Sequence, residues 1–277
     1  MSPATSAPCE SLVELRHVHV RFGLLAVLRD ISLQVRRNET LAVIGESGCG
    51  KTVMLKAMIG LVTPTVGHVL FSGQDLTQLS DAKLARQRTR YGFVFQHAAL
   101  FDSMTVGQNV AFPLRQHRQL NGDEIRDIVI DRLADVGLPE SVVFKWPAEL
   151  SGGMRKRVGL ARALVLDPEI ILYDEPTTGL DPIMSDVINK LIVQTRARGN
   201  VTSVVVTHDM RTAYEVADRI IMLYPLAQLG ADEEQIIFEG TSDEMRQCED
   251  HRVSQFVRGE AGERLTTRGS SKVRHRT

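Results

Sequence analysis

Eight consecutive residues of this chain have the types and spacing of a phosphate-binding loop. They are Gly45, Glu46, Ser47, Gly48, Cys49, Gly50, Lys51 and Thr52, and they match the pattern G-x-x-x-x-G-K-[ST]. Glycines allow positive φ and a close backbone approach, so successive N–H groups can cradle a phosphate. Lys51 can then reach the β- and γ-phosphate oxygens, and the Thr52 hydroxyl can coordinate Mg²⁺. The flanking apolar runs predict the buried strand and the helix that this motif requires.

A second group of reactive residue types lies between positions 150 and 181. It contains Ser151, Gly152, Gly153, Asp174 and Glu175. The serine and paired glycines open a predicted helix, whose N–H groups and dipole favour an anion. The two acids follow a predicted apolar strand, where one carboxylate can hold a metal ion and the other can activate water. The chain therefore has two phosphate-contacting loops, more than one nucleotide needs.

Two polar residues, Gln96 and His208, each follow a predicted buried strand. Parallel strands end at the same edge of a sheet, so we expect both side chains near Gly45 and Asp174. Gln96 could touch Mg²⁺ or the attacking water, and His208 the γ-phosphate. Taken alone, each would be an ordinary structural residue.

Phe22 lies beside a predicted turn at Gly23, within the short apolar/polar alternations of residues 12–36. It is either an ordinary strand aromatic or a platform on which a nucleotide base stacks. The phosphate loop gives weight to the second interpretation.

The elements that must position these residues predict an α/β fold. We expect a P-loop NTPase (RecA-like) core with a parallel sheet, an N-terminal antiparallel β subdomain and an inserted α-helical subdomain. The expected boundaries are a flexible N-terminus (1–11), a domain (12–258) and a disordered basic tail (259–277). Within the domain we expect the core at 12–96 and 166–240, the helical subdomain at 97–165 and a C-terminal extension at 241–258.

Three details of this organisation remain to be tested. The apolar segments 98–101 and 112–114 fit either a small subdomain core or a docking groove for another protein's helix. Asp181 is a predicted N-cap, and the helix after it should have one face lined by Ile183, Val187, Ile188, Leu191 and Ile192. A hairpin is predicted at 219–238, although its connection, 224–234, is long.

The composition excludes several classes of protein. Of 277 residues, 43% are hydrophobic and 24% charged, with a net charge of −1, so nucleic acid is not an expected partner. Three scattered cysteines are too few for a disulfide framework or a zinc site, which favours a reducing compartment. We see neither a secretory signal nor a run of about 20 apolar residues, so the sequence predicts a cytosolic or peripheral protein.

Together these motifs resemble the ATP-binding subunit of an ABC transporter, over about residues 12–259. The decisive feature is the LSGGM-type signature at 150–154, ahead of a strand that ends in Asp174 and Glu175, because other P-loop enzymes lack that loop. The resemblance implies a head-to-tail homodimer. ATP would lie between residues 45–52 of one copy and 151–153 of the other.

The resemblance also assigns a role to each remaining candidate. Phe22 would stack on adenine; Thr52, Gln96 and Asp174 (through water) would position Mg²⁺; Glu175 would be the general base; His208 would contact the γ-phosphate; and Asp181 would communicate across the dimer. The cofactors implied are ATP and Mg²⁺.

Within that family the chain is similar to the Mla-type phospholipid transporter ATPases of bacteria. It is also similar to chloroplast lipid importers, although no transit peptide is visible. The segments that carry the likeness are 96–102, 109–115, 151–157, 179–183 and 255–257. The likeness implies a peripheral location on the cytoplasmic face of the inner membrane. The implied partners are a permease, an MCE-domain lipid-binding protein and, in some systems, a small STAS-domain protein. The connection 224–234 departs from the short turn usual at that place.

Three alternatives stand beside this interpretation. An ABC ATPase for another cargo, such as amino acids or metal ions, would share every catalytic residue. A non-transport ABC protein is disfavoured because the sequence has no long coiled coil, zinc hook or second ATPase module. A nucleotide-sensing adaptor is disfavoured because both Asp174 and Glu175 are present.

Overall fold

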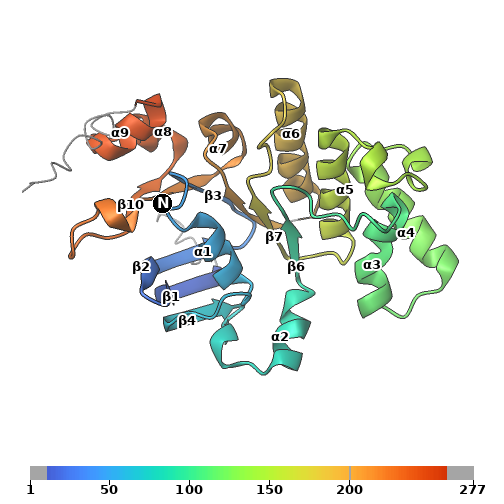
Figure 1. Ribbon diagram of the computed structural model, residues 1–277, viewed down its shortest axis with the longest axis horizontal. Helices are drawn as coiled ribbons and strands as arrows, with labels where there is room; N and C mark the ends of the chain where they lie inside the picture. Colours follow the sequence, from blue (N-terminus) through green and yellow to red (C-terminus); the bar gives the residue numbers. More distant parts are fainter. Residues whose placement is uncertain (1–10, 200, 261–277) are drawn as a thin grey trace, which may run out of the picture.

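The computed structural model describes residues 11–199 and 201–260 of the chain. A six-stranded sheet lies between a four-stranded sheet and a group of helices (Figure 1). Most of the predicted flexible N-terminus (1–11) and basic tail (259–277) lies outside the described residues. Within the described residues, no helix is both long and apolar enough to cross a lipid bilayer.

The six-stranded sheet has the order β10-β9-β3-β8-β7-β6. Its strands are β3 (Thr40–Gly45), β6 (Tyr91–Val94), β7 (Ile170–Asp174), β8 (Thr202–Val206), β9 (Arg219–Leu223) and β10 (Ile236–Gly240). Only β10 pairs antiparallel within it. The strands β3, β7, β8 and β9 are buried along their whole length, which explains their apolar sequences. Because the other five strands are parallel, the loops after β3, β6, β7 and β8 meet at one edge.

The four-stranded sheet is antiparallel, in the order β2-β1-β4-β5. Its strands are β1 (Ser11–Phe22), β2 (Leu25–Arg36), β4 (Val66–Phe71) and β5 (Gln74–Asp75). The sequence predicted two or three short strands where the structure has two long ones, joined at the expected turn. The register between β1 and β2 shifts in four places. Each shift interrupts the apolar/polar alternation of the sequence, so the two long strands resemble several short ones.

Helices cover the six-stranded sheet, and α6 follows the second group of reactive residues. The helices outside the inserted segment are α1 (Lys51–Met58), α2 (Asp81–Arg88), α6 (Pro182–Gly199), α7 (Met210–Val216), α8 (Ser242–Arg246) and α9 (His251–Arg258). Asp181 caps α6 as predicted, because its Oδ1 accepts from the N–H groups of Ile183 (2.9 Å) and Met184 (3.0 Å). Ile183, the first residue of the predicted apolar face, is 77% exposed. The first turn of α6 lies beyond the core, which the helix reaches at Ile188 and Ile192.

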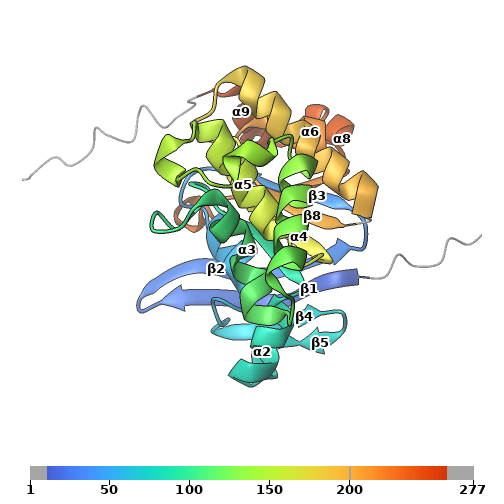
Figure 2. The same cartoon turned by 90° about the vertical axis from the view of Figure 1, so that its right-hand side faces the viewer.

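The inserted segment is helical, as predicted, and forms one side of the molecule (Figure 2). It contains α3 (Val106–His117), α4 (Gly122–Asp135) and α5 (Gly152–Leu164). Thr105 and Asn121 begin α3 and α4 with capping boxes. The buried Val110, Leu133 and Val158 belong to one apolar cluster that continues into β7. The helices therefore pack on the sheet rather than around a separate core.

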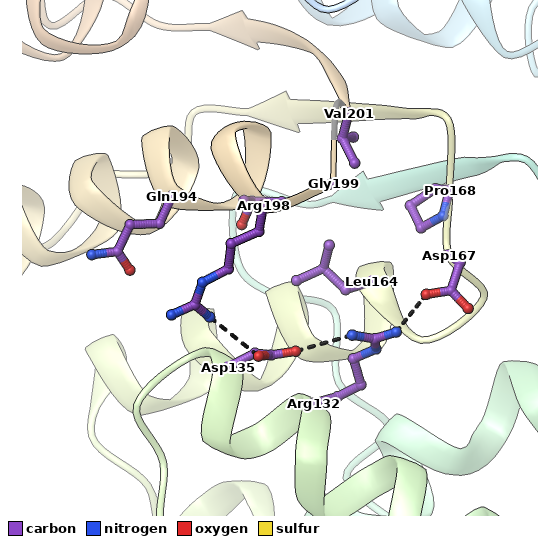
Figure 3. Close-up of a pocket in the computed structure, with 10 residues that line it drawn as sticks. Arg132, Asp135, Leu164, Asp167, Pro168, Gln194, Arg198, Gly199 and Val201 are labelled. Carbon is purple, nitrogen blue, oxygen red and sulfur yellow. Dashed lines mark hydrogen bonds and ion pairs between the residues drawn. The ribbon is translucent and has the colours of Figure 1, made fainter.

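Ion pairs connect this segment to the amino-terminal ends of the parallel strands (Figure 3). Arg132 of α4 pairs with Asp135 (Nη1 to Oδ2, 3.0 Å) and with Asp167, which precedes β7. Arg198 of α6 pairs with Oδ1 of the same Asp135 (3.2 Å). These side chains border a cavity of about 380 Å³. It lies at the opposite edge of the sheet from the loops that follow β3 and β7.

Candidate nucleotide-binding site

The phosphate loop lies between β3 and α1 and touches neighbouring backbone on its outer side. Gly45 has φ 145°, and a Cβ there would lie 2.3 Å from the carbonyl oxygen of Leu223. Gly50 has φ 104°, and a Cβ there would lie 2.8 Å from Cδ2 of Leu28 and 3.0 Å from the oxygen of Val27. Only glycine fits at either position, for reasons of both space and conformation.

Lys51 is 7% exposed although it carries a charge. Its Nζ donates to the carbonyl oxygens of Gly45 (2.7 Å) and Glu46 (2.9 Å). The ammonium group therefore bends back along the loop from the start of α1. A phosphate held by the loop's N–H groups would meet this cation.

Thr52 and Asp174 are brought together from positions 122 residues apart. The Thr52 hydroxyl donates to Oδ1 of Asp174 at 2.8 Å. Burial raises the pKa of the Asp174 carboxyl, the bond from Thr52 opposes that rise, and the neighbouring Glu175 adds to it. A buried carboxylate beside a hydroxyl offers only oxygen donors, which suits Mg²⁺.

A Mg²⁺ site does not require a larger cluster of protein ligands. In the described part of the chain, no group of three or more His, Cys, Asp and Glu residues could hold a metal ion. Mg²⁺ needs no such cage, because it keeps several waters and binds substrate phosphates together with one or two protein oxygens. Thr52 and Asp174 match that requirement.

Glu175 is held by contacts at both its backbone and its carboxylate. It adopts the left-handed conformation (φ 50°), and its N–H donates to the carbonyl oxygen of Val206 (2.9 Å). Its Oε2 accepts from the hydroxyl of Thr178 (3.0 Å) and lies 2.7 Å from Nδ1 of His208. The structure thus brings together the predicted base and the predicted histidine. Two contacts on one oxygen fix the orientation of the Glu175 carboxylate.

The structure places Gln96 and Phe22 at the ends of two strands, one in each sheet. Gln96 lies two residues after the end of β6 (Tyr91–Val94), the neighbour of β7, and is half-buried. Phe22 ends β1 and is 52% exposed on the hairpin, beside the exposed Leu24 and Leu25. An aromatic face open to solvent at this place suits base stacking.

The signature loop has a different environment. Ser151 and Gly152 are exposed at the start of α5, in the helical segment (Figure 1). The Ser151 Oγ accepts from the N–H of Met154 (3.3 Å), so it caps α5 while its own O–H remains a donor. A Cβ at Gly152 would find its nearest neighbour at 3.8 Å, whereas Gly153 is buried against Met184. The outer face of this helix terminus is therefore available to an anion from outside.

Sequence reasoning missed Lys156, which connects the signature helix to Glu175. Lys156 is 7% exposed, and its Nζ donates to the carbonyl oxygen of Glu175 at 3.2 Å. Burial lowers the pKa of this lysine to about 8, against the attraction of Glu175. One signal was present in the sequence: the lysine is spaced for the apolar face of α5, between Gly153 and Leu160.

Comparisons with known proteins show the family to which the chain is similar. The sequence profile of the family described as "ABC transporter" matches residues 28–178. The intermembrane phospholipid transport system ATP-binding protein MlaF of Haemophilus influenzae is 41% identical over 91% of this chain and 92% of that protein. The probable ribonucleotide transport ATP-binding protein mkl of Mycobacterium leprae is 43% identical over 78% of this chain and 62% of that protein.

Solved structures have the same fold. The dimeric structure of MJ0796, a bacterial ABC transporter cassette, has a TM-score of 0.75 and 32% identity, over 83% of this chain and 98% of that one. A dimeric post-hydrolysis state of MJ0796 with ADP and Pi bound has a TM-score of 0.73 and 31% identity, with the same coverage.

Proposed function

We propose that this chain, which belongs to the ABC transporter family of ATP-binding proteins, hydrolyses ATP to drive the movement of phospholipid between bacterial membranes. The family match covers more than half of the chain, and the likeness to MlaF extends over nearly all of it. These two findings identify an ATP-binding cassette that works as a transport ATPase.

The observation that carries the mechanism is the contrast between two loops in one chain. Gly45, Cys49 and Gly50 of the phosphate loop are buried in their own chain and its tip, Ser47 and Gly48, is exposed, whereas Ser151 and Gly152 present a helix terminus to the outside. We infer a head-to-tail homodimer, in which the signature loop of each copy closes over the ATP held by the other. The dimeric state of the MJ0796 cassette supports this inference.

Within one site, Lys51 and the loop N–H groups would hold the phosphates. Thr52, Gln96 and Asp174 would hold Mg²⁺, which supplies charge neutralisation at the phosphate oxygens. The Glu175 carboxylate, held by Thr178 and His208, would accept the proton of the attacking water. His208 shares a hydrogen bond with that carboxylate and would contact the γ-phosphate.

The cargo is proposed from relatives, because the catalytic residues do not depend on it. MlaF belongs to a phospholipid transport system and aligns over almost its whole length. The mkl protein is named for ribonucleotide transport, but this chain spans only 62% of it. Full-length similarity favours phospholipid. Another cargo, whether ribonucleotide, amino acid or metal ion, is the second candidate.

An apolar groove supports docking to a membrane permease, and hence a peripheral location on the cytoplasmic face of the inner membrane. Its volume is about 410 Å³, and its lining includes Phe95, Phe101, Phe112 and Pro113. Phe101 is 43% exposed, and its ring centroid lies 5.0 Å from that of Phe112. The sequence left core and groove as equal interpretations of these segments, and exposed aromatics favour the groove. A helix of the permease would fill it. An MCE-domain lipid-binding protein and a small STAS-domain protein are proposed further partners.

Affinity purification from membranes tests this proposal. We expect the tagged chain to bring down an integral-membrane permease with bound phospholipid, and phospholipid to stimulate the ATPase activity of the complex. A complex free of lipid, whose hydrolysis responds instead to an amino acid or a nucleotide, would favour another cargo. Absence of ATP hydrolysis in an intact complex would refute the ATPase assignment itself.

A further inference from the structure

Gln235 is a buried polar residue to which neither the motifs nor the proposed reaction assigns a role. It directly precedes β10, at the end of the long connection 224–234, and is 1% exposed. Its Nε2 donates to the carbonyl oxygens of Val27 (3.1 Å) and Cys49 (3.0 Å), and its Oε1 accepts from the N–H of Arg29 (2.9 Å). Both amide hydrogens and the amide oxygen are therefore used.

The bond to Cys49 fixes one peptide group of the phosphate loop. In a trans peptide the carbonyl and the following N–H point in opposite directions, and no cis peptide occurs among the described residues. Gln235 pulls the Cys49 carbonyl outward, so the Gly50 N–H points to the other side. Gly50 has no side chain to restrict its backbone, and contacts from outside the loop must therefore hold this peptide.

The other two bonds connect Gln235 to β2. This strand is an edge of the four-stranded sheet, and at Val27 the register with β1 shifts, so that no residue of β1 pairs with Val27. The Gln235 amide bonds to a C=O and an N–H two residues apart, as a neighbouring strand would, and so closes this edge. Because β2 joins β1 at the hairpin that carries Phe22, Gln235 connects the base platform to the phosphate loop.

The long connection is itself fastened to β2. The Arg29 guanidinium donates through Nη2 to the carbonyl oxygens of Gly230 (2.8 Å) and Glu233 (2.7 Å). The Glu233 carboxylate accepts from the N–H of Gly230 (2.7 Å) and from Arg252 of α9 (3.0 Å). These contacts fix the segment that delivers Gln235 to the phosphate loop.

We propose that Gln235 is a positioning residue for the nucleotide, which aims the Gly50 N–H at the phosphates and sets the distance from the phosphate loop to the base-stacking hairpin. This inference rests on the proposed role of residues 45–52 in holding ATP. It gives the connection 224–234 a function, because the connection holds Gln235 in place.

The test is nucleotide binding by the purified full-length chain. Gln235→Glu keeps the size and the acceptor for Arg29, but it replaces the two donated bonds by repulsion from two carbonyl oxygens. We expect the Kd for Mg²⁺ and fluorescently labelled ATP to rise about five- to thirtyfold, the effect of losing one or two buried hydrogen bonds. The kcat at saturating ATP should stay within about twofold, since the change acts on binding. Amide hydrogen exchange should increase over residues 45–52.

Gln228→Glu is the matched control, because it makes the same change at an exposed position of the same connection. It should leave the Kd unchanged. A Gln235→Glu variant that only melts at a lower temperature, with unchanged Kd and exchange, would overturn the inference while leaving the proposed function intact. A wild-type chain that binds no ATP would overturn both.

A second variant covers the case in which Gln235→Glu does not fold. Arg29→Met keeps the backbone N–H that bonds Gln235 but releases the carbonyls of Gly230 and Glu233. We expect the Kd to rise about threefold, because Gln235 stays in place on a looser segment. An unchanged Kd in a folded Arg29→Met variant would also contradict the inference.

Discussion

The phosphate loop (45–52) and the signature loop (150–153) suit the same chemical group but are built in opposite ways. The first touches β2 and the end of β9 on its outer side, encloses its own lysine and is fixed by Gln235. The second is a capped helix terminus with an exposed outer face. This chain packs against the first loop at Gly45 and Gly50 and leaves its tip, Ser47 and Gly48, exposed. In the proposed dimer the second loop is half of a site, which a second copy completes.

The largest expected effect is on ATP hydrolysis, which should depend on Glu175, while ATP binding depends on the phosphate loop. Glu175→Gln keeps the bond-accepting oxygen near Thr178 but removes the base. We expect ATP hydrolysis to fall about 10²- to 10⁴-fold, the usual contribution of a general base, while ATP binding is retained. Steady-state hydrolysis and equilibrium binding of labelled ATP measure the two quantities.

Glu249→Gln is the control, because Glu249 is exposed in the loop before α9. It should hydrolyse ATP at the wild-type rate. Near-wild-type hydrolysis by Glu175→Gln would show that another group takes the proton of the attacking water. Glu175 would then not be the base for the ATP held by the phosphate loop.

Mixed dimers test whether the two loops act on different nucleotides. Lys51→Ala should abolish phosphate binding in its own chain. Gly152→Asp has room for its side chain and suits a helix N-terminus, but it would repel the phosphate of the other chain's ATP. Each variant alone should be inactive. An equal mixture should recover about a quarter of the wild-type activity if its sites act independently, because half of the dimers are mixed and one of the two sites in each mixed dimer is intact.

The result of mixing decides between the two arrangements. If both loops served the same nucleotide in one chain, the mixed dimer would contain no intact site. Hydrolysis in the mixture that does not exceed the sum of the separate variants would therefore contradict the shared-site dimer.

Lys156 connects the two regions, because it lies on the signature helix and donates a hydrogen bond to the backbone carbonyl of Glu175. Lys156→Met keeps an apolar stem and removes the bond. We expect the kcat to fall about tenfold through loss of this bond, with little change in ATP affinity. Lys156→Arg should recover part of the activity, whereas Met at the exposed Arg155 should have no effect. A Lys156→Met variant with a raised Kd and normal kcat would show that the contact serves binding instead.

Much of this fold, and of the part of the site that one chain supplies, could be predicted because each sequence signal is local. The phosphate loop and the strand that delivers Asp174 are read from adjacent residues, and parallel strands bring their ends to one edge. The contact between Glu175 and His208 follows from that rule.

The missed features depend on contacts between distant positions. Gln235 reaches a carbonyl 186 residues away, and Lys156 reaches a backbone group that no motif describes. The exposure of Ile183 depends on where α6 meets the core, which periodicity alone does not specify.

The smallest expected effect concerns the stability of the fold, which the buried Asp174 carboxylate lowers at neutral pH. Burial raises the pKa of Asp174, so this group's contribution to stability is complete below its unfolded pKa and is lost as the pH rises through its folded pKa. At neutral pH the buried charge therefore destabilises the ligand-free fold. Asp174→Asn should raise the melting temperature at pH 7.5 by about 2–4 °C, a typical shift for one favourable substitution in a large domain. The difference should shrink at pH 4.5.

The same variant should gain less from added Mg²⁺ and ATP than the wild type, because Asp174 is a proposed metal ligand. Thermal unfolding at both pH values, with and without Mg²⁺ and ATP, measures all four quantities. A ligand-free variant that melts below the wild type at pH 7.5 would mean that the bond from Thr52 outweighs the cost of burial. In that case the Asp174 carboxylate would stabilise the phosphate loop through its bond with Thr52, as Ser151 stabilises the signature helix α5 by capping it.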